Sequence, residues 1–136
     1  MKMAIKKMNL STLINKGLLT VYGPLFSFVI ACTLIANWVA TTILVSDIAD
    51  FIVVVTFLGS IGIGWIWWSY RIVKWKIWAF SQVDIEDSYR LYEKAIGFGL
   101  IWPTGNLFNR TEIWTKEDKE NWRQLDPEIQ EIFERI

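Results

Sequence analysis

Arg90 and Lys94 lie one helical turn apart in the second half of the chain, beside Tyr89 and Tyr92. Paired cations with adjacent aromatic rings and amides can hold a phosphorylated or nucleotide-like ligand. The turn-rich stretch that follows adds amides and another cation. The predicted ligand-binding residues are Arg90, Lys94, Trp102, Asn106, Asn109 and Arg110. The alternative is that Arg90 and Lys94 are surface charges paired with Glu86 and Glu93.

Catalytic and metal chemistry have few residues to draw on. The 136 residues include no His and one Cys, which excludes His/Cys zinc sites and Ser-His-Asp or Cys-His arrangements. Gly97, Gly99 and Gly105 are too scattered for a phosphate-binding loop of the Walker type. Cys32 lies in an apolar run, where we expect a small packing residue. We therefore expect no enzyme, no catalytic residue, no metal and no cofactor.

The apolar residues gather in two runs. Gly17 to Ser46 and Phe51 to Tyr70 contain no formal charge, and their lengths are 30 and 20 residues. About 20 helical residues cross ~30 Å of hydrocarbon, so both runs predict membrane spans. The fold class is therefore an α-helical integral membrane protein, a two-span transmembrane hairpin that carries a small cytosolic domain. The predicted segments are a basic amphipathic N-terminal segment (1–16), span 1 (17–46), span 2 (51–70), an interfacial helical arm (71–80) and the cytosolic domain (81–136).

Charge gives the orientation of the hairpin. Residues 1–80 carry a net charge of +5 and residues 81–136 a net charge of −5. Four Lys precede span 1 and three basic residues follow span 2, whereas the connector 47–50 contains only acidic charges. The positive-inside rule places both termini in the cytoplasm and the connector outside the cytoplasmic (inner) membrane. The acidic tail argues against double-stranded nucleic acid as a partner.

An aromatic belt follows span 2. Trp concentrates at the headgroup level of a bilayer, with cations that extend to the phosphates. The predicted membrane-interface residues are Trp65, Trp67, Trp68, Arg71, Lys74, Trp75 and Trp78. Because Trp68, Ile72 and Trp75 share one helical face, we expect the helix to continue without a break to about Phe80.

Helix contacts are predicted from small and polar residues within the spans. Thr56, Ser60 and Gly64 recur every four residues, a stripe that lets another helix approach closely. Asn37 lies near the middle of span 1, where an amide exposed to hydrocarbon is costly. It should contact the other helix of the hairpin, another copy of the chain or a water-filled pore.

The tail is predicted to be an α+β, mostly helical domain. A helix from Asp84 with Ile85, Tyr89, Tyr92 and Ile96 on one face should end at Gly97 or Gly99. Residues 100–108 have the turn chemistry of a β-hairpin. Thr115 with Asp118 predicts a capping box, and Asp126-Pro127 starts a last helix. The aromatic side chains exceed what 56 residues can bury, so the arm, another copy or a protein partner should cover them.

No residue motif assigns the chain to a family. Its layout of two spans and a small cytosolic domain is similar to that of small bacterial defence effectors, which perturb the inner membrane when a signal nucleotide binds. That similarity implies an antiviral role and a nucleotide-type ligand. The first hypothesis is a homo-oligomeric membrane effector or channel-like protein, controlled by its tail. The second is an accessory or scaffold subunit of a larger membrane complex, whose tail docks a protein partner.

Overall fold

The computed structural model describes residues 8–43 and 46–134, and these residues form helices and turns without a β-strand. The elements follow one another as α1 (Leu10–Gly17), a π-helical turn (Leu18–Tyr22), α2 (Gly23–Ile43), α3 (Ser46–Phe80), α4 (Ile85–Gly97), a 3-10 helix (Leu107–Thr111), α5 (Lys116–Arg123) and α6 (Pro127–Glu134). The mostly helical fold is as predicted.

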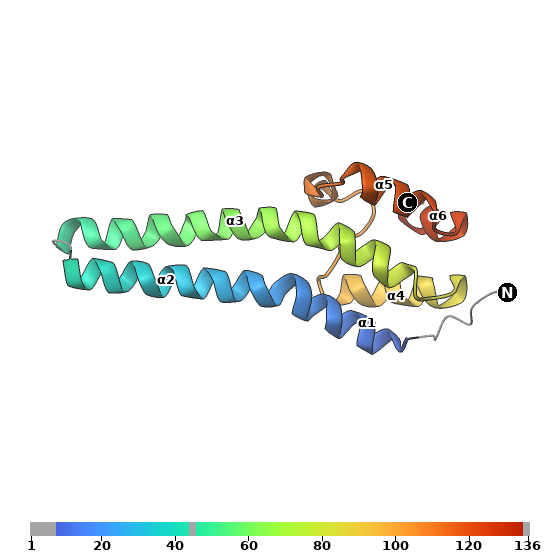
Figure 1. Cartoon of the computed structure of the whole chain (residues 1–136), viewed down its shortest axis with the longest axis horizontal. Coiled ribbons are helices and arrows are strands. Elements are labelled where there is room, and N and C mark those ends of the chain that lie inside the picture. The colour runs from blue at the N-terminus through green and yellow to red at the C-terminus, as the bar shows by residue number, and fades with distance from the viewer. Residues whose placement is uncertain (1–7, 44–45, 135–136) are drawn as a thin grey trace.

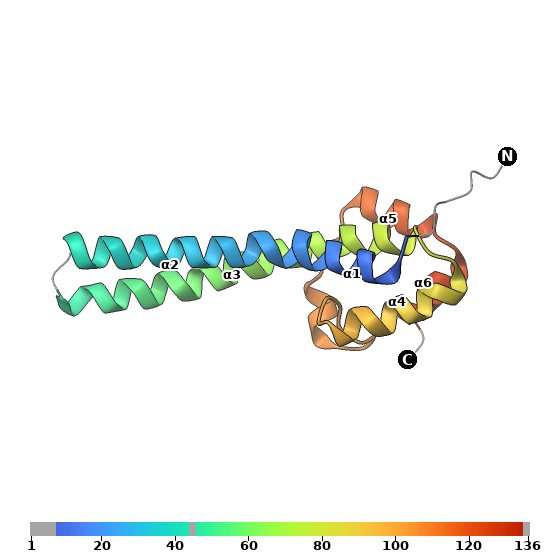
Figure 2. The ribbon, with the colours of Figure 1, turned by 90° about the horizontal axis from the view of Figure 1, so that it is seen from below.

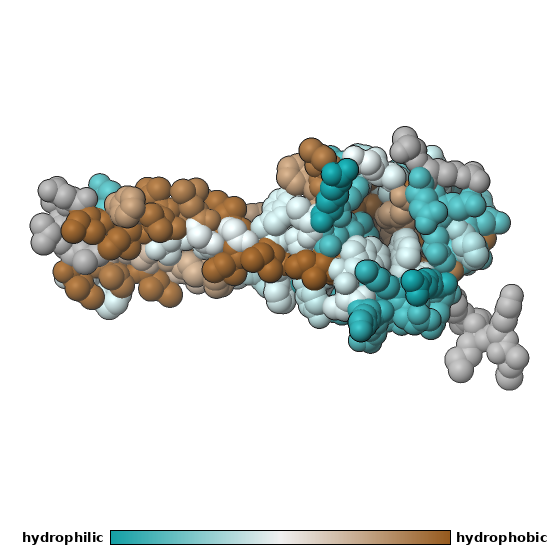
Figure 3. Space-filling model, turned by 90° about the horizontal axis from the view of Figure 1, so that it is seen from above, coloured by the Kyte–Doolittle hydropathy of each residue, from teal (hydrophilic) through white to brown (hydrophobic). Residues whose placement is uncertain are grey.

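Two long apolar helices form an extended hairpin. α2 and α3 run side by side in both views, and the remaining elements gather at one end of this pair (Figures 1 and 2). Side chains such as Leu34, Phe51 and Leu58 are exposed along the hairpin, whose surface is mainly hydrophobic (Figure 3). Leu10–Ile43 and Ile48–Phe80 are long and apolar enough to cross a membrane. The hairpin is thus compatible with a membrane protein.

The first long helix begins at Leu10, within the predicted basic amphipathic segment, and changes its winding before the proline. Residues 10–43 are helical throughout, with the π-helical turn directly before Gly23. The Gly23 N–H donates to the carbonyl of Leu18, an i→i+5 bond typical of a π-bulge. Pro24 has no N–H to place in the α-helical pattern, and the wider turn accommodates it without ending the helix. Lys2, Lys6 and Lys7 of the predicted basic segment lie outside the described residues.

α3 is one unbroken helix of 35 residues. It therefore contains the predicted arm, 71–80, as a direct continuation of the second apolar run. The connector at 47–50 between the two apolar runs belongs to α3, which begins at Ser46.

We call α1, residues 71–80 of α3 and residues 81–134 together the head. Its core joins distant parts of the chain, with Leu13, Ile72, Phe80, Leu91 and Leu100 fully buried. The Trp75 Nε1–H donates to the Leu13 carbonyl at 3.1 Å. The end of α3 is thus the central helix of the head, and it buries aromatic area that the tail cannot bury by itself.

The β-hairpin expected at residues 100–108 is wrong. The Asn106 side chain accepts from the Phe108 N–H at 3.0 Å and caps the 3-10 helix, which begins at Leu107. Leu100 and Ile101 are both buried, whereas adjacent residues of a two-stranded hairpin would point to opposite faces. A turn does form at residues 103–106, as predicted, but a 3-10 helix follows it instead of a strand.

The starts of the tail helices agree with the sequence patterns, but the buried face of α4 differs from the predicted one. The Thr115/Asp118 capping box is present and α6 begins at Pro127. The buried face of α4 consists of Ser88, Leu91, Tyr92 and Ala95. Ile85 and Tyr89, expected on that face, are exposed. The pattern gave weight to the larger side chains, whereas packing against α1 and α6 also buries small residues of α4 such as Ser88 and Ala95.

Candidate functional site

The head contains a small cavity of about 180 Å³ beside the end of α3. Residues from α3, the 3-10 helix and its flanking turns, α5 and α6 line it. They are Lys76, Trp102, Thr104, Asn109, Glu112, Trp114, Trp122 and Phe133. Aromatic rings form much of the wall: Trp122 meets Trp114 and Phe133 edge to face, at centroid distances of 5.6 and 5.0 Å. The cavity therefore offers flat apolar faces with a few polar groups.

A buried ion pair lies at one side of this cavity. Lys76 Nζ and a Glu112 carboxylate oxygen are bonded, and their side chains are only 5% and 4% exposed. The other Glu112 oxygen accepts from Trp114 Nε1 at 3.2 Å. Burial lowers the pKa of Lys76, although Glu112 opposes this shift. Because each charge compensates the other, the cavity does not favour a strongly charged ligand.

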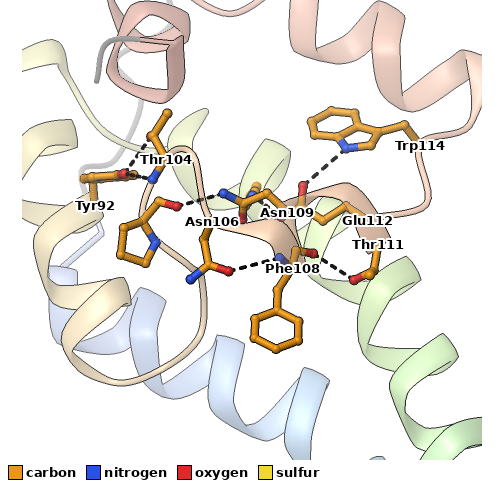
Figure 4. A network of polar contacts seen from close by, with 10 residues as sticks. Tyr92, Thr104, Asn106, Phe108, Asn109, Thr111, Glu112 and Trp114 are labelled. Carbon is orange, nitrogen blue, oxygen red and sulfur yellow. Dashed lines mark hydrogen bonds and ion pairs between the residues drawn. The ribbon is translucent and has the colours of Figure 1, made fainter.

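Hydrogen bonds hold the turn that closes the cavity (Figure 4). The Tyr92 hydroxyl bonds Thr104 through both the threonine hydroxyl (2.8 Å) and its N–H (3.0 Å). Asn109 Nδ2 donates to the Pro103 carbonyl at 2.9 Å. These contacts join α4 to the 3-10 helix and fix the orientation of the Asn109 amide.

Two polar atoms of lining residues have no hydrogen-bond partner among the residues that the structure describes. They are the buried Trp102 Nε1 and Asn109 Oδ1. An unsatisfied buried donor or acceptor costs about 1–3 kcal/mol. A guest with an acceptor for Trp102 and a donor for Asn109 would remove both penalties. An uncharged, flat group that carries an amide, such as a nucleobase, has this chemistry and can stack on the aromatic walls.

The predicted ligand-binding residues do not all meet at this cavity. Trp102 and Asn109 line it, whereas the Asn106 side chain caps the 3-10 helix. Arg90, Lys94 and Arg110 are exposed. The nearest anionic partner of Arg90 is Asp87, 4.0 Å away, and not Glu86 or Glu93. Lys76 and Glu112 line the cavity and were not identified from the sequence, because they lie 36 positions apart and no local pattern links them.

The predicted helix-contact residues divide between the inside and the outside of the hairpin. Ser60 and Gly64 are buried and Thr56 is half-buried. A Cβ added at Gly64 would lie 3.2 Å from Leu25 Cγ of α2, so the small residues permit contact within the chain. Asn37 is exposed, and its amide has no hydrogen bond among the residues described.

The predicted membrane-interface residues surround the junction of hairpin and head. Trp68 and Trp75 are buried in the protein core, and Trp67 is exposed with its Nε1 donating to the Val21 carbonyl at 3.2 Å. Trp65 contacts Phe108 at a centroid distance of 5.2 Å, with the two ring planes tilted by 59°. Arg71, Lys74 and Trp78 are half-buried at this level.

Comparisons with protein-family models, curated proteins and solved structures gave no match to this chain. Its function is therefore argued from its own geometry.

Proposed function

We propose that the protein is a homo-oligomeric, channel-like membrane effector whose hairpin is controlled by the head. The observation that carries this proposal is that α3 runs unbroken from the apolar hairpin into the centre of the head. The tail holds this helix at three successive levels: the Ile113 N–H donates to the Ser69 carbonyl (3.0 Å), Asp118 pairs with Lys74 (3.1 Å), and Glu112 pairs with Lys76. A shift of the tail would move α3.

The aromatic cavity supplies a position from which a ligand can act on this helix. One wall includes Lys76 of α3, and the opposite walls come from the tail. A ligand that binds one arrangement of these walls more tightly than another shifts the population of the hairpin accordingly. We propose that the cavity takes an uncharged, nucleobase-like ring that bears an amide. In a nucleotide-type signal of bacterial defence, the base would occupy the cavity and the phosphates would stay outside it.

The proposed location is the cytoplasmic membrane, with both termini and the head in the cytoplasm. The bias of Lys and Arg toward the flanks of the hairpin supports this orientation. It is also supported by the packing of α1 against α4 and α3, since both flanks of the hairpin then lie on one side. The last residues of α2 and the first residues of α3 lie at the far end (Figure 1).

Self-association is supported by the outward position of Asn37. An amide in hydrocarbon without a partner is unfavourable, and contact with a second copy or with pore water would remove that cost. The aromatic surplus of the tail no longer argues for oligomers, because α1 and α3 cover much of it.

Membrane depolarisation in cells that produce the protein tests the effector role. In the variant Val73→Gly/Ile77→Gly, α3 should lose rigidity between head and hairpin, because Gly costs about 1 kcal/mol relative to Ala at each helical position. The control, Val73→Ala/Ile77→Ala, removes nearly the same side-chain atoms and keeps the helix. We expect the wild type and the Ala variant to depolarise the membrane when induced, and the Gly variant to do so no longer. If no protein depolarises the membrane at matched levels, the effector proposal is wrong.

A second candidate function is that of a scaffold subunit. A cleft of about 760 Å³ between α4 and α6 favours it, because Tyr89 and Ile85 lie there with acidic Glu86, Glu128 and Glu131. Such a cleft suits a basic, aromatic segment of a protein partner. Mass measurement in detergent separates the two roles: a defined homo-oligomer supports the effector, and a monomer supports the scaffold.

A further inference from the structure

A second pocket, of about 220 Å³, lies between α1 and α3, where the hairpin enters the head. Six residues line it, and none of them is acidic: Lys16, Thr20, Arg71, Lys74, Trp75 and Trp78. Three cations from two helices thus share one concave site. Lys16 is distant in the sequence from Arg71 and Lys74, and the packing of α1 on α3 brings it to them.

The cations in this pocket are only partly compensated. Lys74 pairs with Asp118 at 3.1 Å. Lys16 lies over the Trp78 ring at 4.3 Å, and the Arg71 guanidinium lies 5.5 Å from the centroid of the Trp67 ring. Aromatic faces attract these cations without neutralising them. With Asp118 counted against Lys74, the site keeps a formal excess of two positive charges.

Arg71 also has an unused donor. Its Nε is buried and lacks a hydrogen-bond partner among the residues that the structure describes. A guanidinium matches the oxygens of a phosphate in a bidentate way, and Lys adds a strong point charge. A phosphate group in the pocket would accept hydrogen bonds from the Arg71 guanidinium.

The position of the pocket indicates the source of that phosphate. The apolar surface of the hairpin ends just beside it, with Leu19 73% exposed and Trp67 39% exposed. In a bilayer, Trp rings at this position mark the headgroup level, and basic pockets on the cytoplasmic side bind anionic headgroups. A soluble phosphate has the same chemistry but gains nothing from the adjacent apolar surface.

We propose that Lys16, Arg71 and Lys74 form a phosphate site for the headgroup of an anionic phospholipid in the cytoplasmic leaflet. The site holds α1 against α3 at the membrane surface. The proposal rests on the proposed membrane insertion of the hairpin and is independent of the effector role.

Native mass spectrometry of the full-length protein in detergent tests the site, with phosphatidylglycerol or phosphatidylcholine added. We expect the wild type to retain one phosphatidylglycerol in preference to phosphatidylcholine. The variant Lys16→Gln/Arg71→Gln should bind phosphatidylglycerol roughly 10- to 30-fold more weakly. The matched control, Lys119→Gln/Arg123→Gln, removes two positive charges from exposed positions of α5 and should bind like the wild type.

Further measurements address the remaining explanations. Arg71→Lys keeps the charge but loses the fork, so it should bind with intermediate affinity even if the double variant does not fold. The proposal would be overturned if the wild type, Arg71→Lys and the double variant all bound phosphatidylglycerol equally well. It would also be overturned if the wild type retained phosphatidylglycerol and phosphatidylcholine equally. If millimolar inorganic phosphate displaced the lipid, the bound phosphate group would not need to come from a lipid headgroup, and the lipid assignment would be overturned. Extraction of the protein from membranes by carbonate would show instead that the hairpin does not insert.

Discussion

Lys76 of α3 and Glu112, the residue after the 3-10 helix, form an ion pair whose two side chains are almost completely buried. The Lys76 Nζ also lies 5.3 Å from the centroid of the Phe133 ring in α6. One lysine therefore connects the end of the long helix with two separate parts of the tail. A charge in such a place is tolerated only because its partner is equally fixed.

The first prediction concerns the stability of this pair. Glu112→Leu leaves Lys76 buried without its partner and should lower the free energy of unfolding by about 3–5 kcal/mol. The double variant Lys76→Met/Glu112→Leu removes both charges and should recover most of this loss. Trp fluorescence during denaturant unfolding in detergent measures both effects. Arg123→Gln, which breaks an exposed 3.6 Å pair with Glu120, should change stability by less than about 1 kcal/mol. Equal losses in the single and double variants would contradict the prediction.

A second prediction concerns acid stability through Asp118. Burial raises the pKa of this carboxyl, but hydrogen bonds from Thr115 and Lys74 outweigh it and leave the pKa below its ordinary 3.8. The unfolded chain therefore binds more protons near this pH, so acid reduces stability. The stability difference between wild type and Asp118→Asn should be constant near neutral pH. It should shrink as the pH falls from 3.8 through the lower pKa of the folded state. A difference that is the same at every pH would argue against a shifted carboxyl.

The third prediction is that Gly17 permits the close approach of α1 and α3. A Cβ at this position would lie 2.5 Å from Trp75 Nε1 and 3.0 Å from Leu100 Cδ1. Gly17→Ala should therefore displace Trp75 and cost about 1–3 kcal/mol. At Gly23, an added Cβ meets nothing within 4 Å, so Gly23→Ala should be neutral or stabilising by up to about 1 kcal/mol. Thermal unfolding of the two variants in the same detergent compares them directly.

Features fixed by neighbouring residues could be predicted from the sequence. The Thr115/Asp118 box needs only residues three apart, and the continuity of α3 follows from the spacing of Trp68, Ile72 and Trp75. Composition also predicted that the tail needs a covering for its aromatic rings, because so short a segment cannot bury them. It left open whether the arm, another copy or a partner supplies that covering, and in the structure the end of α3 does so.

Features that depend on distant contacts could not be predicted. Nothing in the sequence near Lys76 indicates that this lysine will be buried and paired with Glu112. Likewise, nothing near Gly17 indicates that Trp75 will pack against it. The turn at 103–106 could be predicted from its own residues. Whether a strand or a helical turn follows depends on whether the Asn106 side chain caps it, which the sequence does not show. In the candidate cavity, Trp102 and Asn109 were identified, whereas its charged pair was not.

The fourth prediction concerns orientation in the membrane. Single cysteines at Asp50 and Gln124, both exposed, can be labelled from outside intact cells in a Cys32→Ala background. With the termini in the cytoplasm, only the Asp50→Cys variant should react with a reagent that cannot cross the membrane. After the cells are permeabilised, the Gln124→Cys variant should react as well, which controls for its accessibility. Labelling of Gln124→Cys alone in intact cells would reverse the proposed orientation.

The last prediction concerns Asn37 and the contact between copies. Its amide is exposed on α2, whereas the hydroxyls of Thr33 and Thr41 donate to carbonyls of their own helix, at 2.8 Å to Val29 and 2.9 Å to Asn37. Asn37 is therefore the side chain of this group that gains most from a second molecule. A hydrogen bond between helices in a membrane contributes about 0.6–2 kcal/mol. Asn37→Leu should weaken self-association by a corresponding factor of roughly 3 to 30. Thr33→Val, which removes a hydroxyl already satisfied within its helix, should leave it unchanged. Resonance energy transfer between labelled copies in detergent measures the dissociation constant of each variant. Equal affinity of wild type and Asn37→Leu would mean that Asn37 lies outside the contact.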